Sequence, residues 1–112
     1  MSELKTQWKV WTDEGAGVTD ESLKVWKSCK GKLGRIWHII IKQHTPPEFN
    51  MEIYADHGFV LLSGCNCGYG GTGPHGTLEI FNDLGILGMQ DVIFSNSEVR
   101  WPLPSDNSLA KW

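Results

Sequence analysis

The feature that most constrains this chain is a glycine-rich segment at residues 64–76, which reads G-C-N-C-G-Y-G-G-T-G-P-H-G. Six of its thirteen residues are glycine, the residue that loses the most backbone entropy on folding. Such a segment suits a backbone that needs unusual angles or that another group approaches closely. The segment follows a predicted strand and precedes a predicted helix, so backbone N–H groups and a helix N-terminus would point at one place. It therefore predicts a site for a negatively charged ligand.

The predicted ligand site combines this segment with residues from elsewhere in the chain. Backbone amides of residues 68–73 would hold a phosphate group, the Thr72 hydroxyl would add a donor, and Tyr69 would stack on a base. The chain has two arginines, each a candidate for bidentate contact with the phosphate, and Trp101 follows the second of them. The full predicted set is Gly68, Tyr69, Gly70, Gly71, Thr72, Gly73, Arg35, Arg100 and Trp101. No lysine stands where a P-loop would have one, which argues against nucleotide hydrolysis.

Four other interpretations of this part of the chain remain open. The glycines can serve only to pack the helix tightly on the sheet. Cys65 and Cys67, with His57 and His75, supply a possible zinc set, although two thiolates one residue apart in a strand would point to opposite faces. The same cysteines and histidines could form a thiol enzyme, and Glu79 with Asp83 could form a carboxylate pair on one helix face. A solvated helix face explains that carboxylate pair equally well.

Composition limits the class of protein and its partners. The chain has 112 residues, 40% of them hydrophobic, and a net charge of −3, which predicts one domain over residues 1–112 and argues against binding a nucleic acid polymer. Three cysteines, no signal peptide and no long apolar run predict a cytoplasmic protein that does not enter a membrane. Six tryptophans predict a rigid core, with some apolar surface left for homo-oligomerisation.

One stretch of the chain is locally basic despite the net negative charge. Its five cations, with no acid between them, are Lys24, Lys27, Lys30, Lys32 and Arg35. The stretch is either a solvated face or one wall of an anion site.

Hydrophobic patterning predicts an α+β fold. A mostly antiparallel sheet of about five or six strands is expected, with strands near 4–11, 35–42, 49–55, 59–63, 91–94 and 98–101. The run I-W-H-I-I-I-K at 36–42 is apolar on both faces, which favours a central strand. One helix is expected at 74–84, after the glycine-rich segment, and a shorter one at 21–29, where Thr19 or Asp20 can cap it. Two prolines at 46–47 would end a strand, and residues 56–58 would form a hairpin turn.

Part of the chain resembles a known family. The motifs G-F-V at 58–60 and G-Y-G-G-T-G-P at 68–74, a Leu- and Ile-rich helix and a closing L-P-…-W resemble small uncharacterised bacterial and phage proteins that carry a G-F-x-W-G-Y-G-G-S-G-P signature. Thr72 replaces the usual serine, residues 61–67 are inserted, and the tryptophan before Gly68 is missing. The resemblance implies a mobile-element origin, where small proteins often bind host machinery rather than catalyse a reaction.

These observations predict a non-enzymatic binding protein, without a cofactor, for a phosphate-bearing small molecule of the nucleotide class. By analogy with phage proteins, it could act in the host cytoplasm as a sponge that sequesters a host immune cyclic-nucleotide signal. One alternative is a protein–protein interaction module that inhibits a host protein. A second is a small metal- or thiol-dependent hydrolase.

Overall fold

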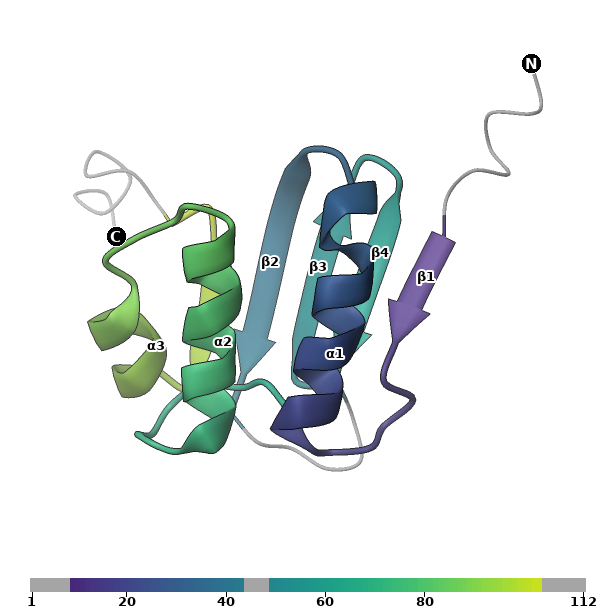
Figure 1. Ribbon diagram of the computed structural model, residues 1–112. Coiled ribbons are helices and arrows are strands. Elements are labelled where there is room, and N and C mark those ends of the chain that lie inside the picture. Colours follow the sequence, from purple (N-terminus) through teal and green to yellow (C-terminus); the bar gives the residue numbers. More distant parts are fainter. Residues whose placement is uncertain (1–8, 44–48, 104–112) are drawn as a thin grey trace, which may run out of the picture.

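Five strands form one sheet, and the helices lie on one face of it (Figure 1). The computed structural model describes residues 9–43 and 49–103. In chain order the elements are β1 (Lys9–Thr12), α1 (Thr19–Cys29), the short 3-10 helix η2 (Lys30–Lys32), β2 (Ile36–Lys42), β3 (Met51–Ala55), β4 (Gly58–Leu62), α2 (Thr72–Asp83), α3 (Gln90–Ser95) and β5 (Glu98–Trp101). The expected strand residues 4–8 and the proline pair at 46–47 lie outside the described residues.

The sheet is mixed, with the strand order β1-β4-β3-β2-β5. Its β2–β3, β3–β4 and β2–β5 pairs are antiparallel, whereas β1 runs parallel to β4. The chain reaches β2 from β1 through helix α1, the kind of crossover that places strands in a parallel orientation. The predicted α+β class with a mostly antiparallel sheet is therefore confirmed. The apolar run at 36–42 is the interior strand β2, as its pattern indicated.

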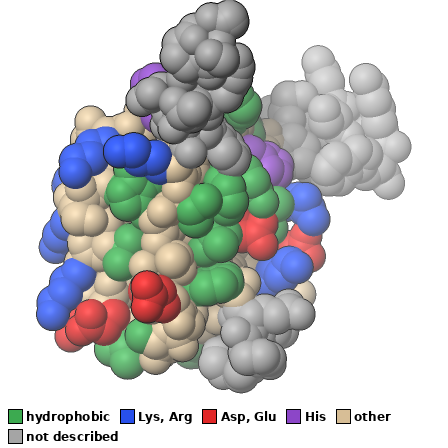
Figure 2. All heavy atoms as spheres, turned by 90° about the vertical axis from the view of Figure 1, so that its right-hand side faces the viewer, with side chains coloured by type: hydrophobic (Ala, Val, Ile, Leu, Met, Phe, Trp, Pro, Cys, Tyr) green, Lys and Arg blue, Asp and Glu red, His purple; other side chains and the backbone are tan. Residues whose placement is uncertain are grey.

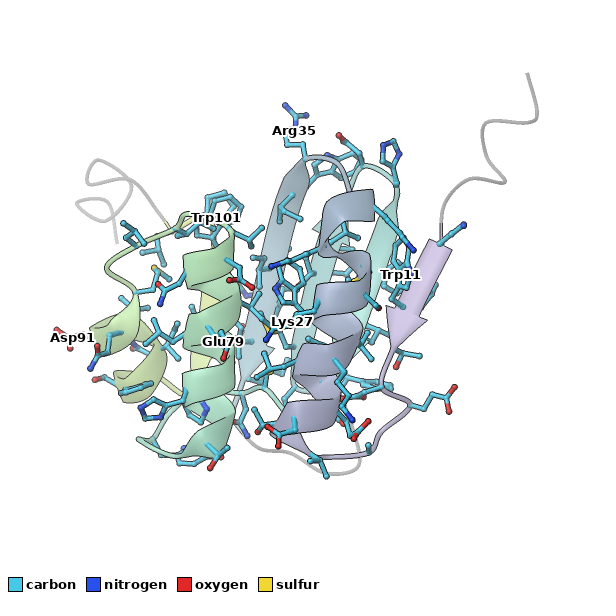
Figure 3. The ribbon with its side chains drawn as sticks, viewed as in Figure 1. Trp11, Lys27, Arg35, Glu79, Asp91 and Trp101 are labelled. Atoms are coloured by element: carbon cyan, nitrogen blue, oxygen red, sulfur yellow. The ribbon has the colours of Figure 1, made fainter. Side chains whose placement is uncertain are left out.

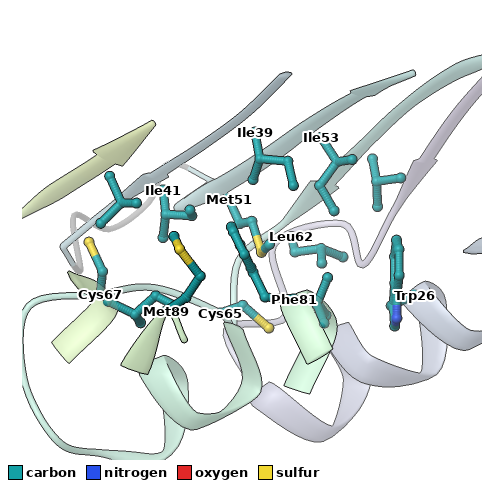
Figure 4. Packing of buried hydrophobic residues seen from close by; sticks show 14 of the residues in the cluster. Trp26, Ile39, Ile41, Met51, Ile53, Leu62, Cys65, Cys67, Phe81 and Met89 are labelled. Atoms are coloured by element: carbon teal, nitrogen blue, oxygen red, sulfur yellow. The ribbon is translucent and has the colours of Figure 1, made fainter. Parts of the chain in front are cut away.

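The core lies between the sheet and the helices (Figure 4). Strands β3 and β4 alternate between buried and partly buried residues, so that Ile53 and Val60 face the core while their neighbours face the other side. On the helix side, Trp26, Ile80 and Phe81 are fully buried. No described helix covers the opposite face of the sheet (Figure 1).

One predicted element is wrong: residues 91–94 do not form a strand but lie in helix α3. Their sequence, D-V-I-F, is a short apolar run, and such a run does not by itself distinguish a strand from one helical turn. The helix is closed by local hydrogen bonds, from Ile93 N to Met89 O and from Asn96 Nδ2 to Val92 O. Helix α1 begins at Thr19 after an uncapped Val18, and α2 begins at Thr72, both earlier than expected.

Polar contacts hold α1 against α2. The buried Trp26 donates its indole N–H to Asp83 Oδ2 at 2.9 Å, and Lys30 Nζ lies 3.2 Å from the same oxygen. One turn away, Lys27 Nζ lies 3.3 Å from Glu79 Oε2, and Figure 3 shows this pair between the two helices. The two carboxylates of α2 therefore serve the interface between the helices, not a catalytic pair or a purely solvated face.

We predict that Asp83→Ala lowers the free energy of unfolding by about 1–3 kcal/mol, because the buried indole N–H of Trp26 loses its acceptor. Asp91→Ala is the matched control, since Asp91 is exposed and has no partner among the described residues; its effect should stay within about 0.5 kcal/mol. Urea unfolding followed by circular dichroism measures both.

We also predict that the stability contributed by Asp83 depends on pH. The Trp26 N–H, followed by Lys30, lowers the pKa of Asp83 below its ordinary value of 3.8. A lowered folded-state pKa contributes stability above the ordinary value, and that contribution is lost as the pH falls through the folded-state pKa. The difference between wild type and Asp83→Ala should therefore shrink in acid. A difference that stays constant down to the acid unfolding transition would contradict this assignment.

Candidate functional site

Helices α1 and α2 begin at the same end of the molecule, the lower end in Figure 1. Between their first residues lies a cleft of about 380 Å³. Its lining comes from three segments, namely Gly17 and Thr19, then Ser63, Gly64 and Asn66, and finally Tyr69, Thr72 and Gly73. Two helix N-termini, each with partial positive charge, therefore border one cleft.

The side chains of the wall on the α1 side are engaged in hydrogen bonds within the chain, although the first amides of α1, from Thr19 to Glu21, have no acceptor among the described residues. Asp13 accepts from Ser63 N at 2.9 Å and from Ser22 Oγ at 2.5 Å. Ser63 Oγ also donates to Asp13 and accepts from Gly17 N at 2.6 Å. These bonds tie the connection between β1 and α1 to the end of β4. The side-chain hydroxyls of this wall are therefore engaged within the fold.

Gly64 allows α1 to approach the end of β4 closely. A Cβ at this position would overlap the carbonyl group of Val18. Thr19 Oγ1 donates to Gly64 O at 2.6 Å, and Gly64 N donates to Ser22 Oγ at 2.8 Å. Thr19 was expected as a helix cap, but its side chain instead fastens the helix to the glycine-rich segment. The packing interpretation of the glycines thus applies at Gly64.

The wall on the α2 side is open. Backbone N–H groups from Tyr69 to Gly73 donate to no acceptor within the described part of the chain, and the Gly71 N-cap supplies no side-chain cap. Only at the ends of the segment are amides engaged, with Gly68 N donating to Ile93 O at 2.8 Å and His75 N to Gly71 O at 3.2 Å. Unpaired N–H groups at a helix start are the groups that bind anions in proteins.

Asn66 is a buried polar side chain on the same wall. It is 4% exposed, and its Oδ1 atom is buried without a hydrogen-bond partner among the described residues. Its backbone is anchored to the second turn of α2, because Thr77 Oγ1 donates to Asn66 O at 2.7 Å. The carboxamide packs so closely on Gly73 that a Cβ there would overlap it. An unsatisfied buried amide beside a cleft is a group that a bound molecule can satisfy.

Tyr69 forms the rim of the cleft. It is 42% exposed, and its ring lies over Gly71, where a Cβ would overlap the ring carbons. The glycine therefore leaves room for the flat face of the tyrosine beside the free amides.

The structure brings together only part of the predicted site. Tyr69, Thr72 and Gly73 line the cleft with Gly70 and Gly71 between them, whereas Gly68 is tied to Ile93. Arg35 lies at the far end of β2 from the cleft (Figure 3).

The remaining predicted cation and aromatic residue also lie away from the cleft. Arg100 is on β5, where its Nε lies 2.7 Å from Glu98 Oε2, and Trp101 is partly buried on the same strand. None of the residues that line the cleft is a lysine or an arginine.

Sequence reasoning missed five of the eight residues that line the cleft, namely Gly17, Thr19, Ser63, Gly64 and Asn66. Only Asn66 carried a usable signal, as the one polar side chain between the two cysteines of the glycine-rich segment. The others lie beside the cleft because of hydrogen bonds between residues more than forty positions apart in the sequence, from Gly17 to Ser63 and from Thr19 to Gly64.

The cysteines and histidines of the alternative site are not assembled. Cys65 and Cys67 are fully buried, His57 lies in the turn between β3 and β4, and His75 Nδ1 donates to Gly71 O at 2.8 Å. No group of three potential metal ligands occurs among residues 9–43 and 49–103. Burial raises the pKa of Cys65 to about 12 and that of Cys67 to about 11. Both thiols are therefore protonated, and weakly nucleophilic, near neutral pH.

The sequence matches no protein-family model, and comparisons with curated proteins and with solved structures give no match either. Within the described residues, no helix is both long and apolar enough to cross a membrane.

We predict that Gly64→Ala destabilises the protein by about 1–3 kcal/mol, because its methyl group would force the start of α1 away from β4. Gly31→Ala is the matched control, since a Cβ at Gly31 meets no atom within 4 Å. That substitution should leave stability unchanged or raise it slightly, because alanine restricts the unfolded chain. Urea unfolding compares the two variants, and equal effects would mean that the close approach at Gly64 is unimportant.

We also predict that the three cysteines resist alkylation by iodoacetamide in the native protein and react promptly in urea, since all three are buried. Burial raises the folded-state pKa values from 9.0 to about 11 for Cys29 and Cys67 and to about 12 for Cys65. A raised pKa means that the folded state holds protons that the unfolded state releases, so stability should fall as the pH rises above about 9. Mass spectrometry and urea unfolding at several pH values measure the two effects.

Proposed function

We propose that the protein is a non-enzymatic binding protein for a phosphate-bearing small molecule of the nucleotide class, held in the cleft between the starts of α1 and α2. The main observation in support is the wall of that cleft on the α2 side, where the amides from Tyr69 to Gly73 have no acceptor among the described residues. The buried Asn66 carboxamide, with its unpartnered oxygen, is a second and independent sign of a missing partner.

The chemistry of this wall suits a phosphate group. Thr72 and Gly73 are the first two residues of α2, so their N–H groups add to the positive end of a twelve-residue helix. The Thr72 hydroxyl supplies a further donor. Because a helix end can stabilise an anion without a basic side chain, the absence of lysine and arginine from the lining does not prevent binding.

The opposite wall determines how a ligand would lie. Asp13 stands behind Ser63, and the first turn of α1 carries Asp20 and Glu21. These carboxylates disfavour a second anion on the α1 side, so the phosphate belongs at α2. The exposed ring of Tyr69 at the rim supplies a surface on which a base can stack.

The same lining argues for binding without turnover. Its hydroxyl groups belong to Thr19, Ser63, Tyr69 and Thr72, and the first two are committed to hydrogen bonds within the chain. A protein that holds a nucleotide without converting it lowers the free concentration of that nucleotide, which is the action of a sponge. Sequestration of a cyclic-nucleotide signal is the form of this proposal that the phage-type resemblance suggests.

A thermal-shift screen of linear and cyclic nucleotides tests the proposal, with the unphosphorylated nucleosides as controls. A ligand at a hundred times its Kd stabilises the folded protein by about 2.7 kcal/mol. We expect a concentration-dependent rise in Tm with at least one nucleotide and none with its nucleoside. If no nucleotide shifts Tm at millimolar concentration, the protein is not a nucleotide-binding protein, and the interaction module becomes the better interpretation.

Variants at Thr72 locate the binding. Thr72→Pro removes one amide hydrogen at the first helical position, where proline is well tolerated, and the extended Gly71 before it (φ −106°, ψ −166°) suits a following proline. Calorimetry should show about tenfold weaker binding for Thr72→Pro. Thr72→Ser, the control that keeps both donors, should bind like wild type. Equal affinity of wild type, Thr72→Pro and Thr72→Ser would mean that the amides at the start of α2 do not bind the ligand.

A further inference from the structure

A second groove, of about 370 Å³, lies at the other end of the molecule from the α1/α2 cleft. It is lined by Lys9 and Trp11 of β1, Lys32 of η2 and His57 in the turn between β3 and β4. It shares no lining residue with the first cleft. Figure 2 views the molecule from its β1 edge and shows hydrophobic side chains down the middle of this face, with lysine or arginine side chains on the helix side.

The walls of this groove are held in place by backbone hydrogen bonds. His57 N donates to Leu33 O at 3.0 Å, which fixes the turn to the residue after η2. Lys9 N donates to His57 O at 3.0 Å, which fixes the start of β1 to the same turn. The three segments that carry the lining side chains are therefore joined directly, so the groove needs little rearrangement to receive a ligand.

The lysines of the groove lack acidic partners. In the basic stretch of the chain, Lys24 pairs with Glu21, Lys27 with Glu79 and Lys30 with Asp83. Neither Lys9 nor Lys32 has an ion pair with any described carboxylate. Two lysines without an ion pair to any described carboxylate, at one groove, create a local attraction for anions on a protein whose net charge is −3.

A carboxylate on the same turn does not cancel this charge through an ion pair. Asp56 Oδ2 accepts from Arg35 N at 2.9 Å, and its Oδ1 accepts from the Trp37 indole at 2.6 Å. These two donors also lower the pKa of Asp56. Both of its oxygens are thus engaged at the β2 side of the turn.

Trp11 gives the groove a flat aromatic surface. The side chain is partly buried and packs against the core, which limits its freedom to turn. Its indole N–H donates to no acceptor in the described chain, whereas the indoles of Trp26 and Trp37 donate to Asp83 and Asp56. A tryptophan with an unused donor beside two lysines offers stacking, a hydrogen bond and charge at one place.

We propose that this groove is a second binding site, which takes a planar aromatic molecule that carries an anionic group. The ring packs on Trp11, and the anion lies between Lys9 and Lys32, with the His57 imidazole as a further donor. Each half of the ligand meets a different part of the lining, so the ring and the charge must both be present for full affinity. The site is independent of the proposed phosphate site at the start of α2.

The test uses 1-naphthyl phosphate as the probe, with inorganic phosphate and 1-naphthol as its separate halves. Binding is followed by NMR of the ¹⁵N-labelled full chain through the indole N–H signals, and Trp11→Phe identifies the signal of Trp11. We expect a saturable shift of that signal with 1-naphthyl phosphate, and at least about tenfold weaker binding of each half. No saturable shift at millimolar probe would overturn the proposal.

Charge-matched variants locate the anion. Lys32→Gln and Lys24→Gln each remove one exposed lysine of the basic stretch, but only Lys32 lines the groove. Lys32→Gln should weaken the probe about tenfold, and Lys24→Gln should leave its affinity unchanged. Equal weakening by both variants would mean diffuse attraction rather than a site, and would overturn the proposal.

Thr72→Pro separates this inference from the proposed nucleotide site, because it should weaken nucleotide binding and leave the Trp11 signal and the affinity for 1-naphthyl phosphate unchanged. If Thr72→Pro lowers the affinity for the probe as strongly as Lys32→Gln does, the probe occupies the α1/α2 cleft, and the proposal of a second site is wrong.

Discussion

The close approach between the end of β4 and the start of α1 is the contact on which the functional end of the molecule depends. It requires Gly64, because any side chain there would overlap Val18, and it is fastened by Asp13, which gathers donors from Ser63 and Ser22. This contact sets the N-terminus of α1 beside that of α2. Without it the two helix ends would not border a common cleft, and the glycine-rich segment would be a simple connection.

The two walls of the cleft differ in their side chains and in their charge. On the α1 side the hydroxyls of Thr19 and Ser63 have partners within the chain, and the first turn of the helix carries Asp20 and Glu21, which disfavour an anion at its amides. On the α2 side the helix start keeps its amides free, and Asn66 keeps a buried oxygen unsatisfied. Buried polar groups without partners reduce stability, so a molecule that supplies those partners would bind and stabilise the protein at once.

The lysines of the basic stretch have two different roles in the folded chain. Three of its lysines pair with acids, and two of those pairs, at Lys27 and Lys30, join α1 to α2. Lys32, one turn beyond the helix, has no ion pair with a described carboxylate and lines a groove with Trp11 and His57 at the other end of the sheet. One local run of charge thus contributes both to helix packing and to an anion-attracting groove, because Lys27 faces α2 whereas Lys32 lies beyond the end of α1.

The sequence by itself determined most of the elements: the β-branched run of β2, the hairpin that joins β3 to β4, and a helix after the glycine-rich segment all follow from local patterns. It also located three of the eight residues that line the cleft between α1 and α2, namely Tyr69, Thr72 and Gly73, because free amides depend on a local turn into a helix. Only the tertiary structure decided that residues 91–94 are helical, that β1 is parallel to β4, and that Ser63 and Thr19 meet at the cleft while Arg35 lies far from it. The physical reason is the distance along the sequence over which the deciding interactions act. Backbone conformation follows from neighbours in sequence, whereas these features depend on packing and hydrogen bonds between segments that are tens of residues apart.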